Sequence, residues 1–276
     1  MPRLAWEAKR LIGSGPEFVQ DIYHTAFTAE ERSEEKTTIG PSRLFVMTST
    51  RAQDFHGAQF SLAEMFPKFL ETAPLHAVRA LITVEEAYLV RRHEMRANQP
   101  IQTFEFEGKQ ARIRADGSGL WDEFSVYGHD EPVKMLADLQ RHLEKLAATP
   151  EGGGVIQGIL SEVATSNETA FVWRRLLASG ASCPDVIGRA LRPLLWASPV
   201  LSSFDTTRLA GECLRRVFPL LTADERQKVE AAILEIGSSR DELDVRTSDR
   251  ILGCLPVGCL VSSGARDRVN VLQSSG

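Results

Sequence analysis

The stretch from Glu168 to Leu201, ETAFVWRRLLASGASCPDVIGRALRPLLWASPVL, predicts two helices joined by a tight turn. Its first part carries apolar residues at a spacing that places them on one side of a 3.6-residue helix. These residues are Ala170, Trp173, Leu176 and Leu177. Gly180 is expected to end this helix, because glycine tolerates positive φ just past a last turn. Arg174 and Arg175 lie largely off the apolar stripe, so we expect them on the solvent face.

The second part of the stretch predicts another amphipathic helix. Ser182 is a candidate N-cap, and Pro184 lies near the first helical position, where a missing N–H does no harm. Pro193 is expected to kink or shorten the helix, because it removes one backbone hydrogen bond. The apolar stripe consists of Ile187, Leu191, Leu194 and Leu195. Two such helices form an αα-hairpin, which buries its apolar stripes by stacking on other hairpins.

Helical patterns continue on both sides of this stretch, with one interruption at residues 101–127. There, IQTFEFEGKQARIRADG alternates apolar and polar residues around turn signals at Gly108 and Gly117, which is typical of a β-hairpin. The run Gly152–Gly154 is interpreted as a flexible linker. We therefore divide the chain into an N-terminal helical region, 1–150, with the hairpin insert near 101–127, and a C-terminal array of helical hairpins, 151–276.

The fold class predicted from these patterns is mainly α. Helix pairs recur at irregular spacing, on the order of the ~40 residues of HEAT or armadillo units. No strict repeat signature accompanies them. An irregular α-solenoid is therefore favoured, with a globin-like packing or a helical bundle as the alternatives.

Charge and hydropathy limit the classes of function. The formal net charge of −5 argues against a general nucleic-acid binder, although a local basic patch stays an alternative. No apolar run approaches the ~18 to 20 residues needed to span a bilayer. The N-terminus, MPRLAWEAKRLIG, lacks the long apolar core of a signal peptide. We therefore expect a cytoplasmic protein without membrane association.

The cysteines give no metal-binding pattern. Cys183, Cys213, Cys254 and Cys259 form no CxxC pair, and a zinc site would need ligands brought from elsewhere in the chain. We interpret them as reduced, mostly buried small apolar residues. No metal and no cofactor are predicted.

Two basic groups are candidate binding residues. Arg91, Arg92 and Arg96 lie near a predicted helix end, where they could hold a phosphate or an acidic partner. Favourable placement near the helix C-terminus explains them equally without a ligand. The second group comprises Arg174 and Arg175, together with Arg189 and Arg192.

His129 is the most site-like histidine. It lies beside Asp130 in a polar turn, where it could serve as a general base; a surface or capping role is the alternative. The sequence contains neither of the glycine-rich nucleotide-binding motifs, GxxxxGK[ST] and GxGxxG, and neither of the hydrolase motifs HExxH and GxSxG. No catalytic residue is predicted.

Several segments together resemble a known family. They are EFVQDIYHTAFTAEERSEEKT, RLFVMTSTRAQDFHGAQFSLAEMFPKFLETAP, HAVRALITVEEAYLVRRH and DRILGCLP. This combination resembles the helical region that follows the NTPase module in large bacterial STAND-type proteins, some of which act in antiphage defence. The resemblance implies a sensor or scaffold, with the ATPase and effector elsewhere in a longer polypeptide. This chain lacks a nucleotide-binding motif, so we expect a fragment or a stand-alone relative.

Three functions are compatible with these observations. The leading hypothesis is a non-enzymatic helical scaffold or sensor that binds a protein partner. The second is an enzyme with an unrecognised site around His129 and Asp130. The third is a nucleic-acid-binding helical repeat that uses the arginine groups.

Overall fold

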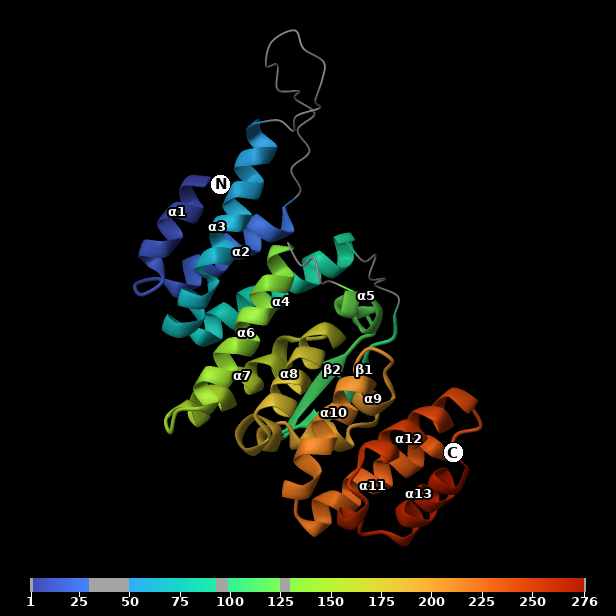
Figure 1. Ribbon diagram of the computed structural model, residues 1–276. Coiled ribbons are helices and arrows are strands. Elements are labelled where there is room, and N and C mark those ends of the chain that lie inside the picture. Colours follow the sequence, from blue (N-terminus) through green and yellow to red (C-terminus); the bar gives the residue numbers. More distant parts are fainter. Residues whose placement is uncertain (1, 30–49, 93–98, 125–129, 276) are drawn as a thin grey trace, which may run out of the picture. The chain divides into compact units, whose positions relative to one another are not determined.

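The computed structural model describes residues 2–29, 50–92, 99–124 and 130–275. Over these residues the chain is mainly helical, with one small antiparallel sheet of two strands, as predicted (Figure 1). It forms two compact units, Met1–Arg92 with Gly128–Leu139, and His93–Tyr127 with Gln140–Gly276. The division of the sequence at residue 150 stays a prediction; in the structure, the hairpin shares its unit with residues 140–276.

The first unit is a cluster of helices. It contains α1 (Pro2–Leu11), α2 (Pro16–Thr28), α3 (Thr50–Thr72), α4 (Pro74–Arg92) and the start of α6 (Glu131–Ala147). Tyr23 lies at its centre, fully buried, and its hydroxyl donates to the carbonyl of Leu62 at 2.6 Å. Its ring packs against Phe66 and Phe69. The buried hydroxyl therefore has the partner that a buried polar group requires.

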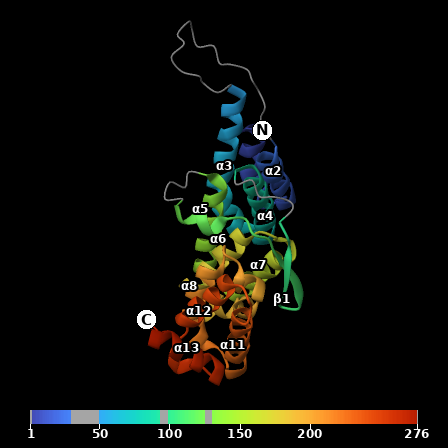
Figure 2. The same cartoon turned by 90° about the vertical axis from the view of Figure 1, so that its right-hand side faces the viewer.

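The hairpin of the second unit consists of β1 (Gln102–Phe106) and β2 (Lys109–Ile113). Its register pairs Phe104 with Ala111, and both residues are buried. The two-residue turn, Glu107 and Gly108, has positive φ at both positions, as the tight turns that match strand twist require. The strand β2 packs on α7 (Gly152–Ser166). Figure 2 shows the hairpin beside this helix.

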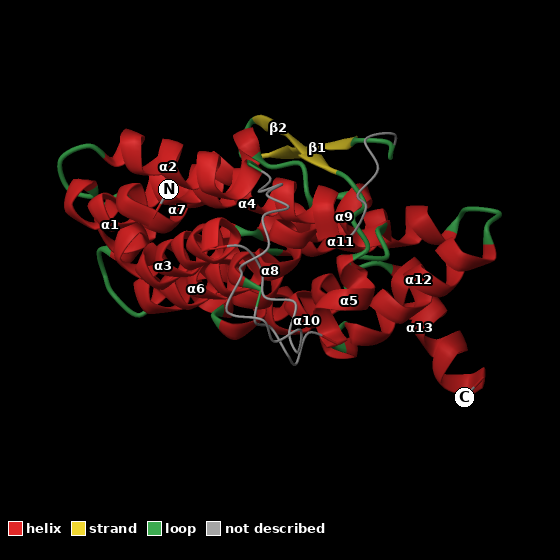
Figure 3. Cartoon of the chain, turned by 90° about the horizontal axis from the view of Figure 1, so that it is seen from above, coloured by secondary structure: helices red, strands yellow, loops and turns green. Residues whose placement is uncertain are grey.

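The remaining second-unit elements are α5 (Ser118–Phe124), α8 (Ala170–Ser182), α9 (Ser198–Ser202), α10 (Thr207–Val217), α11 (Ala223–Gly237), α12 (Glu242–Cys254) and α13 (Ser263–Ser275). The helix α10 packs against α8 on one side and against α12 on the other. At the start of α11, Thr222 and Glu225 form a capping box. Figure 3 shows the two strands in yellow among the helices in red.

The interpretation of Gly180 as a helix stop is wrong, because α8 continues to Ser182. Gly180 lies inside the helix where α10 approaches closely. A Cβ atom at this position would lie 2.9 Å from the sulfur of Cys213. The glycine is therefore required by helix packing and not by a positive φ.

The predicted second helix of the stretch is also wrong in its continuity. The chain instead forms a π-helical turn (Pro184–Gly188), a 3₁₀ turn (Arg192–Trp196) and α9. Each of these begins with a proline in its first turn, where the missing N–H is harmless. Ser182 is the last residue of α8 and is not an N-cap. The interruption at Pro193 agrees with the expectation that this proline kinks or shortens the helix, whereas the π-helical turn after Pro184 was not expected.

The linker predicted at Gly152–Gly154 is helical, because these residues form the first turn of α7. A Cβ atom on Gly152 would lie 2.0 Å from the carbonyl oxygen of Leu146. The glycine at 152 therefore permits close contact between the end of α6 and the start of α7, and the run is not a flexible connection.

Candidate functional site

The helix α8 buries the predicted stripe, but it also buries Phe171, Val172 and Arg174 outside that stripe, so it is enclosed on nearly all sides. Trp173 is fully buried, and its indole N–H donates to the carbonyl of Arg112 at 2.8 Å. Its ring centroid lies 5.4 Å from that of Phe104 and 5.8 Å from that of Phe106. The hairpin therefore packs directly on α8 and fixes the position of that helix in the unit.

A buried aspartate holds the N-terminal end of α8. The side chain of Asp116 accepts a hydrogen bond from the backbone N–H of Phe171 at 2.7 Å and from that of Ser118 at 3.0 Å. Phe171 lies in the first turn of α8, where backbone N–H groups have no partner within the helix. Asp116 therefore supplies, from a distant part of the chain, the cap that Thr169 does not provide.

A second buried aspartate holds the loop that carries Asp116. Asp205 accepts hydrogen bonds from the backbone N–H groups of Asp116 and Gly119, both at 2.9 Å, and of Gly117 at 3.2 Å. Gly117 has a φ of 76°, a conformation that glycine adopts without strain. Asp205 thus connects the segment before α10 to the start of α5.

Burial beside Asp205 changes the ionisation of Asp116. Burial, followed by the nearby negative charge of Asp205, raises the pKa of Asp116 from 3.8 to about 6. Hydrogen bonds from the backbone N–H groups of Ser118 and Phe171 act in the opposite direction. Asp116 therefore holds its negative charge less readily than an exposed aspartate would.

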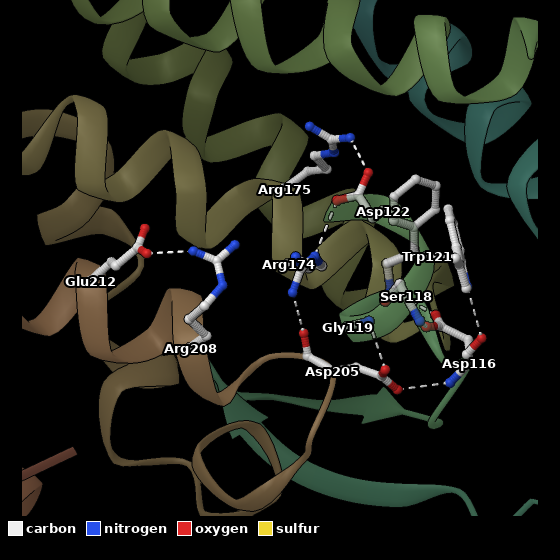
Figure 4. Close-up of polar contacts among 11 residues, drawn as sticks. Asp116, Ser118, Gly119, Trp121, Asp122, Arg174, Arg175, Asp205, Arg208 and Glu212 are labelled. Atoms are coloured by element: carbon white, nitrogen blue, oxygen red, sulfur yellow. Dashed lines mark hydrogen bonds and ion pairs between the residues drawn. The ribbon is translucent and has the colours of Figure 1, made fainter. Parts of the chain in front are cut away.

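The prediction that Arg174 faces solvent is wrong. Its side chain is only 2% exposed. Its Nε donates to Asp122 at 3.1 Å, and its Nη1 donates to the carbonyl of Asp205 at 2.8 Å. Arg175, less deeply buried, contacts the other oxygen of Asp122 (Figure 4). Both partners come from segments distant in sequence, so the α8 pattern alone could not locate them.

A groove between α8 and α10 lies at the opposite end of α8. Its volume is about 740 Å³. It is lined by Ala178, Ala181, Ser182, Pro184, Glu212, Arg215 and Arg216. The α8 wall is made of small side chains, whereas the α10 wall is charged.

The charges of the α10 wall are only partly compensated. Glu212 forms an ion pair with Arg208 one turn earlier on the same helix, as Figure 4 shows. Arg215 and Arg216 are exposed, and within the described part of the chain their side chains form no ion pair or hydrogen bond. The groove therefore presents two uncompensated cations beside small side chains.

Two members of the predicted arginine group, Arg91 and Arg92, lie at the end of α4 in the first unit. Arg91 donates to the backbone carbonyls of Phe27, Ala29 and Ala87, so it satisfies the C-terminal end of α2. Arg92 is exposed and lines a cavity of about 770 Å³. Arg91 lines the same cavity, but its guanidinium is bonded to backbone carbonyls of the protein itself.

The second-ranked prediction, an enzyme around His129 and Asp130, is described only in part. Asp130 accepts a hydrogen bond from the hydroxyl of Tyr88 at 2.8 Å. His129 and Arg96 lie outside the described residues. A catalytic role for this pair stays a prediction.

No sequence pattern marks Asp116, Asp205, Arg215 or Arg216 as a site residue. Asp116 was visible only as a turn signal before Gly117. Arg215 and Arg216 occupy the last turn of α10, where basic residues are common. What distinguishes them is the lack of partners, and this depends on tertiary structure.

Over residues 2–29, 50–92, 99–124 and 130–275, no three His, Cys, Asp or Glu side chains gather as a metal site would require. In the same ranges, no helix combines the length and the apolar character of a bilayer span. The four cysteines are free thiols; Cys213 is buried and the others are half-buried.

Comparison with protein-family models, with curated protein sequences and with solved structures gives no match. The resemblance to the helical region of STAND-type NTPases therefore stays a prediction. Any functional conclusion has to come from the chain's own geometry.

Proposed function

We propose that the chain is a non-enzymatic helical scaffold or sensor module that binds a protein partner. The observation that carries this proposal is the lateral packing of α8, α10 and α12. Helices stacked in this way expose a continuous row of faces, which suits recognition of another macromolecule. The α8–α10 groove lies within that row.

The stack also supports an irregular α-solenoid over a bundle. The three helices begin at Ala170, Thr207 and Glu242, so each starts roughly 36 residues after the one before, within the roughly 33 to 47 residues that helical repeat units span. Glycines mark both close approaches. A Cβ atom on Gly180 would meet Cys213, and one on Gly211 would lie 3.1 Å from the sulfur of Cys254.

A second layer accompanies the stack. The helix α11 packs against the 3₁₀ turn Arg192–Trp196, against α9 and against α13. Two layers of short helices are the architecture in which each repeat contacts mainly its neighbours. The proposal treats α8, α10 and α12 as one layer of such an array.

The family resemblance adds a biological setting to the proposal. Residues 17–37, 43–74, 76–93 and 249–256 carry it. We infer that the module serves as the sensing or scaffolding part of a larger bacterial NTPase system, either as a fragment or as a stand-alone relative. A P-loop encoded in the same reading frame or elsewhere in the same operon would support this setting, and the absence of both would contradict it.

Affinity capture tests the function directly. The tagged chain is incubated with a lysate of its source organism, with and without nuclease, and bound proteins are identified by mass spectrometry. The proposal expects the same protein to be enriched in both arms relative to the tag alone. Loss of all captured material on nuclease treatment would indicate a nucleic-acid-binding repeat instead. Turnover of a captured small molecule would indicate an enzyme.

A further inference from the structure

The arginines around α8 and α10 fall into two classes. Arg174 and Arg175 share Asp122, and Arg208 pairs with Glu212. Arg215 and Arg216 have no such partners within the described residues. Because Glu212 already pairs with Arg208, it does not fully compensate these two cations. The C-terminal half of α10 therefore carries net positive charge beside the groove.

The shape of the groove follows from the close packing beneath it. The sulfur of Cys213 approaches the backbone of Gly180, so α8 and α10 lie too close for larger side chains between them. Above this contact, α8 offers Ala178 and Ala181, which are half-buried and project little. The turn at Pro184 also lines the groove. The space thus has a small-residue wall, and cations line it from the α10 side.

We propose that this groove binds an acidic segment of a partner protein, with carboxylates of the segment paired to Arg215 and Arg216. The inference rests on the proposed function and adds the chemistry of the partner. Arginine is suited to this role because its planar guanidinium can bind a carboxylate through two parallel hydrogen bonds. The segment lies against Ala178 and Ala181, where a main chain can approach α8 closely.

An acidic peptide fits better than a nucleic acid for two reasons. Nucleic-acid binding usually neutralises several phosphates along a backbone, whereas this groove offers two uncompensated cations. The whole chain also carries a formal net charge of −5, which repels a polyanion beyond the groove. A short segment with a few carboxylates matches the local charge and meets less of that repulsion than a polyanion does.

Fluorescence anisotropy with a defined probe tests the inference. The probe is a fluorescein-labelled peptide of glutamate, alanine and glycine, and its matched control has glutamine in place of every glutamate. We expect the wild-type chain to bind the glutamate peptide about tenfold more tightly than the glutamine peptide, since ion pairing distinguishes the two. Binding should weaken as salt is raised.

The double variant Arg215→Gln, Arg216→Gln is expected to lose that tenfold preference. The matched control is Arg246→Gln, Arg250→Gln, which removes the same charge from exposed positions on α12. It should bind within about twofold of wild type, because it leaves the groove intact. Equal binding by the groove variant and wild type would overturn the inference, as would tighter binding of an equally charged single-stranded DNA.

A second variant tests the groove without removing either arginine. Ala178→Glu places a carboxylate on the α8 wall, where it competes for the same cations. We expect it to reduce glutamate-peptide binding by about tenfold, with Ala178→Gln as the uncharged control of equal size. Unchanged binding by Ala178→Glu would contradict the proposed location. Thermal unfolding of each variant confirms that the chain remains folded.

Repeating the lysate capture with the groove variants separates this inference from the proposed function. Loss of the captured partner in Arg215→Gln, Arg216→Gln, but not in the α12 control, supports both. Equal capture by the two variants would leave the proposed function intact and would overturn the inference that the groove binds the partner. If the wild-type chain captures no protein while still preferring the glutamate peptide, the proposed function fails and the groove chemistry stands.

Discussion

The charged side chains at the two ends of α8 differ in burial and in pairing. At its N-terminal end, Asp116, Asp205 and Arg174 are almost fully buried, and each bonds to a backbone group or a charge from a distant segment. At its C-terminal end, Arg215 and Arg216 lie exposed beside the groove and pair with nothing in the described residues. The comparison separates charges that hold the fold from charges that are available to a partner.

The physical basis of the difference is desolvation. A charge removed from water must regain its lost hydration through specific partners, so breaking one buried pair costs more than the pair contributes. An exposed arginine keeps its hydration and loses little when its neighbours change. The two ends should therefore respond differently to mutation, and four predictions examine that contrast.

Replacing Arg174 should have the largest effect. Arg174→Met keeps most of the apolar stem but removes the donors to Asp122 and to the carbonyl of Asp205. We expect the free energy of unfolding to fall by about 3 to 5 kcal/mol, as measured by urea denaturation. The control Arg175→Met, at a side chain with 22% exposure, should lose clearly less. Equal losses would mean that burial does not distinguish the two arginines.

The carboxylate cluster should make stability depend on pH. The pKa of Asp116 is raised to about 6, so the folded state binds this proton more tightly than the unfolded state does. Its contribution to stability is complete below the unfolded pKa, near 3.8, and is lost as pH rises through about 6. The loss should reach up to about 3 kcal/mol at neutral pH.

Asp116→Asn isolates this contribution. Because asparagine does not ionise, the variant should gain stability relative to wild type as pH rises from about 4 to 7. Urea denaturation across that range measures the difference. The exposed Asp185→Asn is the matched control, and it should keep the wild-type profile. A difference between wild type and Asp116→Asn that stays constant with pH would contradict the assigned linkage.

Replacing a glycine beneath the groove by alanine should destabilise the chain, because the neighbouring atoms are closely packed there. A Cβ atom on Gly188 would lie 2.5 Å from Val217 and 2.9 Å from the carbonyl oxygen of Gly180. Gly188→Ala is therefore expected to destabilise by about 1 to 3 kcal/mol. Gly153 in α7 has open space around it, so Gly153→Ala should stabilise by about 0.5 kcal/mol. Similar thermal midpoints for both variants would remove the packing argument.

The sequence predicted those parts of the fold that depend on local pattern. The stripe containing Trp173 is buried, and the hairpin lies where its alternation indicates. These features depend on neighbouring residues, whose spacing is visible in one stretch of chain. The coarse class, mainly helical with a small hairpin, followed from them.

The errors arose where distant segments decide the outcome. Gly180 resembles a helix stop, yet it is the approach of Cys213 that requires glycine there. Arg174 lies off its own helix's apolar stripe, yet Asp122 and the carbonyl of Asp205 bury and pair it. The candidate groove could not be predicted from the sequence for the same reason. The lack of partners at Arg215 becomes evident only when the neighbouring elements are in place.

The smallest expected effect on stability is at the groove. Arg215→Gln, Arg216→Gln should change the free energy of unfolding by less than about 0.5 kcal/mol, because both side chains are exposed and lose no internal partner. Urea denaturation of this double variant and of Arg174→Met, measured in parallel, compares the loss of stability at the groove with the loss at the buried arginine. A loss above about 1 kcal/mol would place these arginines among the charges that hold the fold. A near-zero change combined with lost glutamate-peptide binding would assign them to recognition, because a residue that stabilises nothing inside the chain can affect binding only through what it contacts outside.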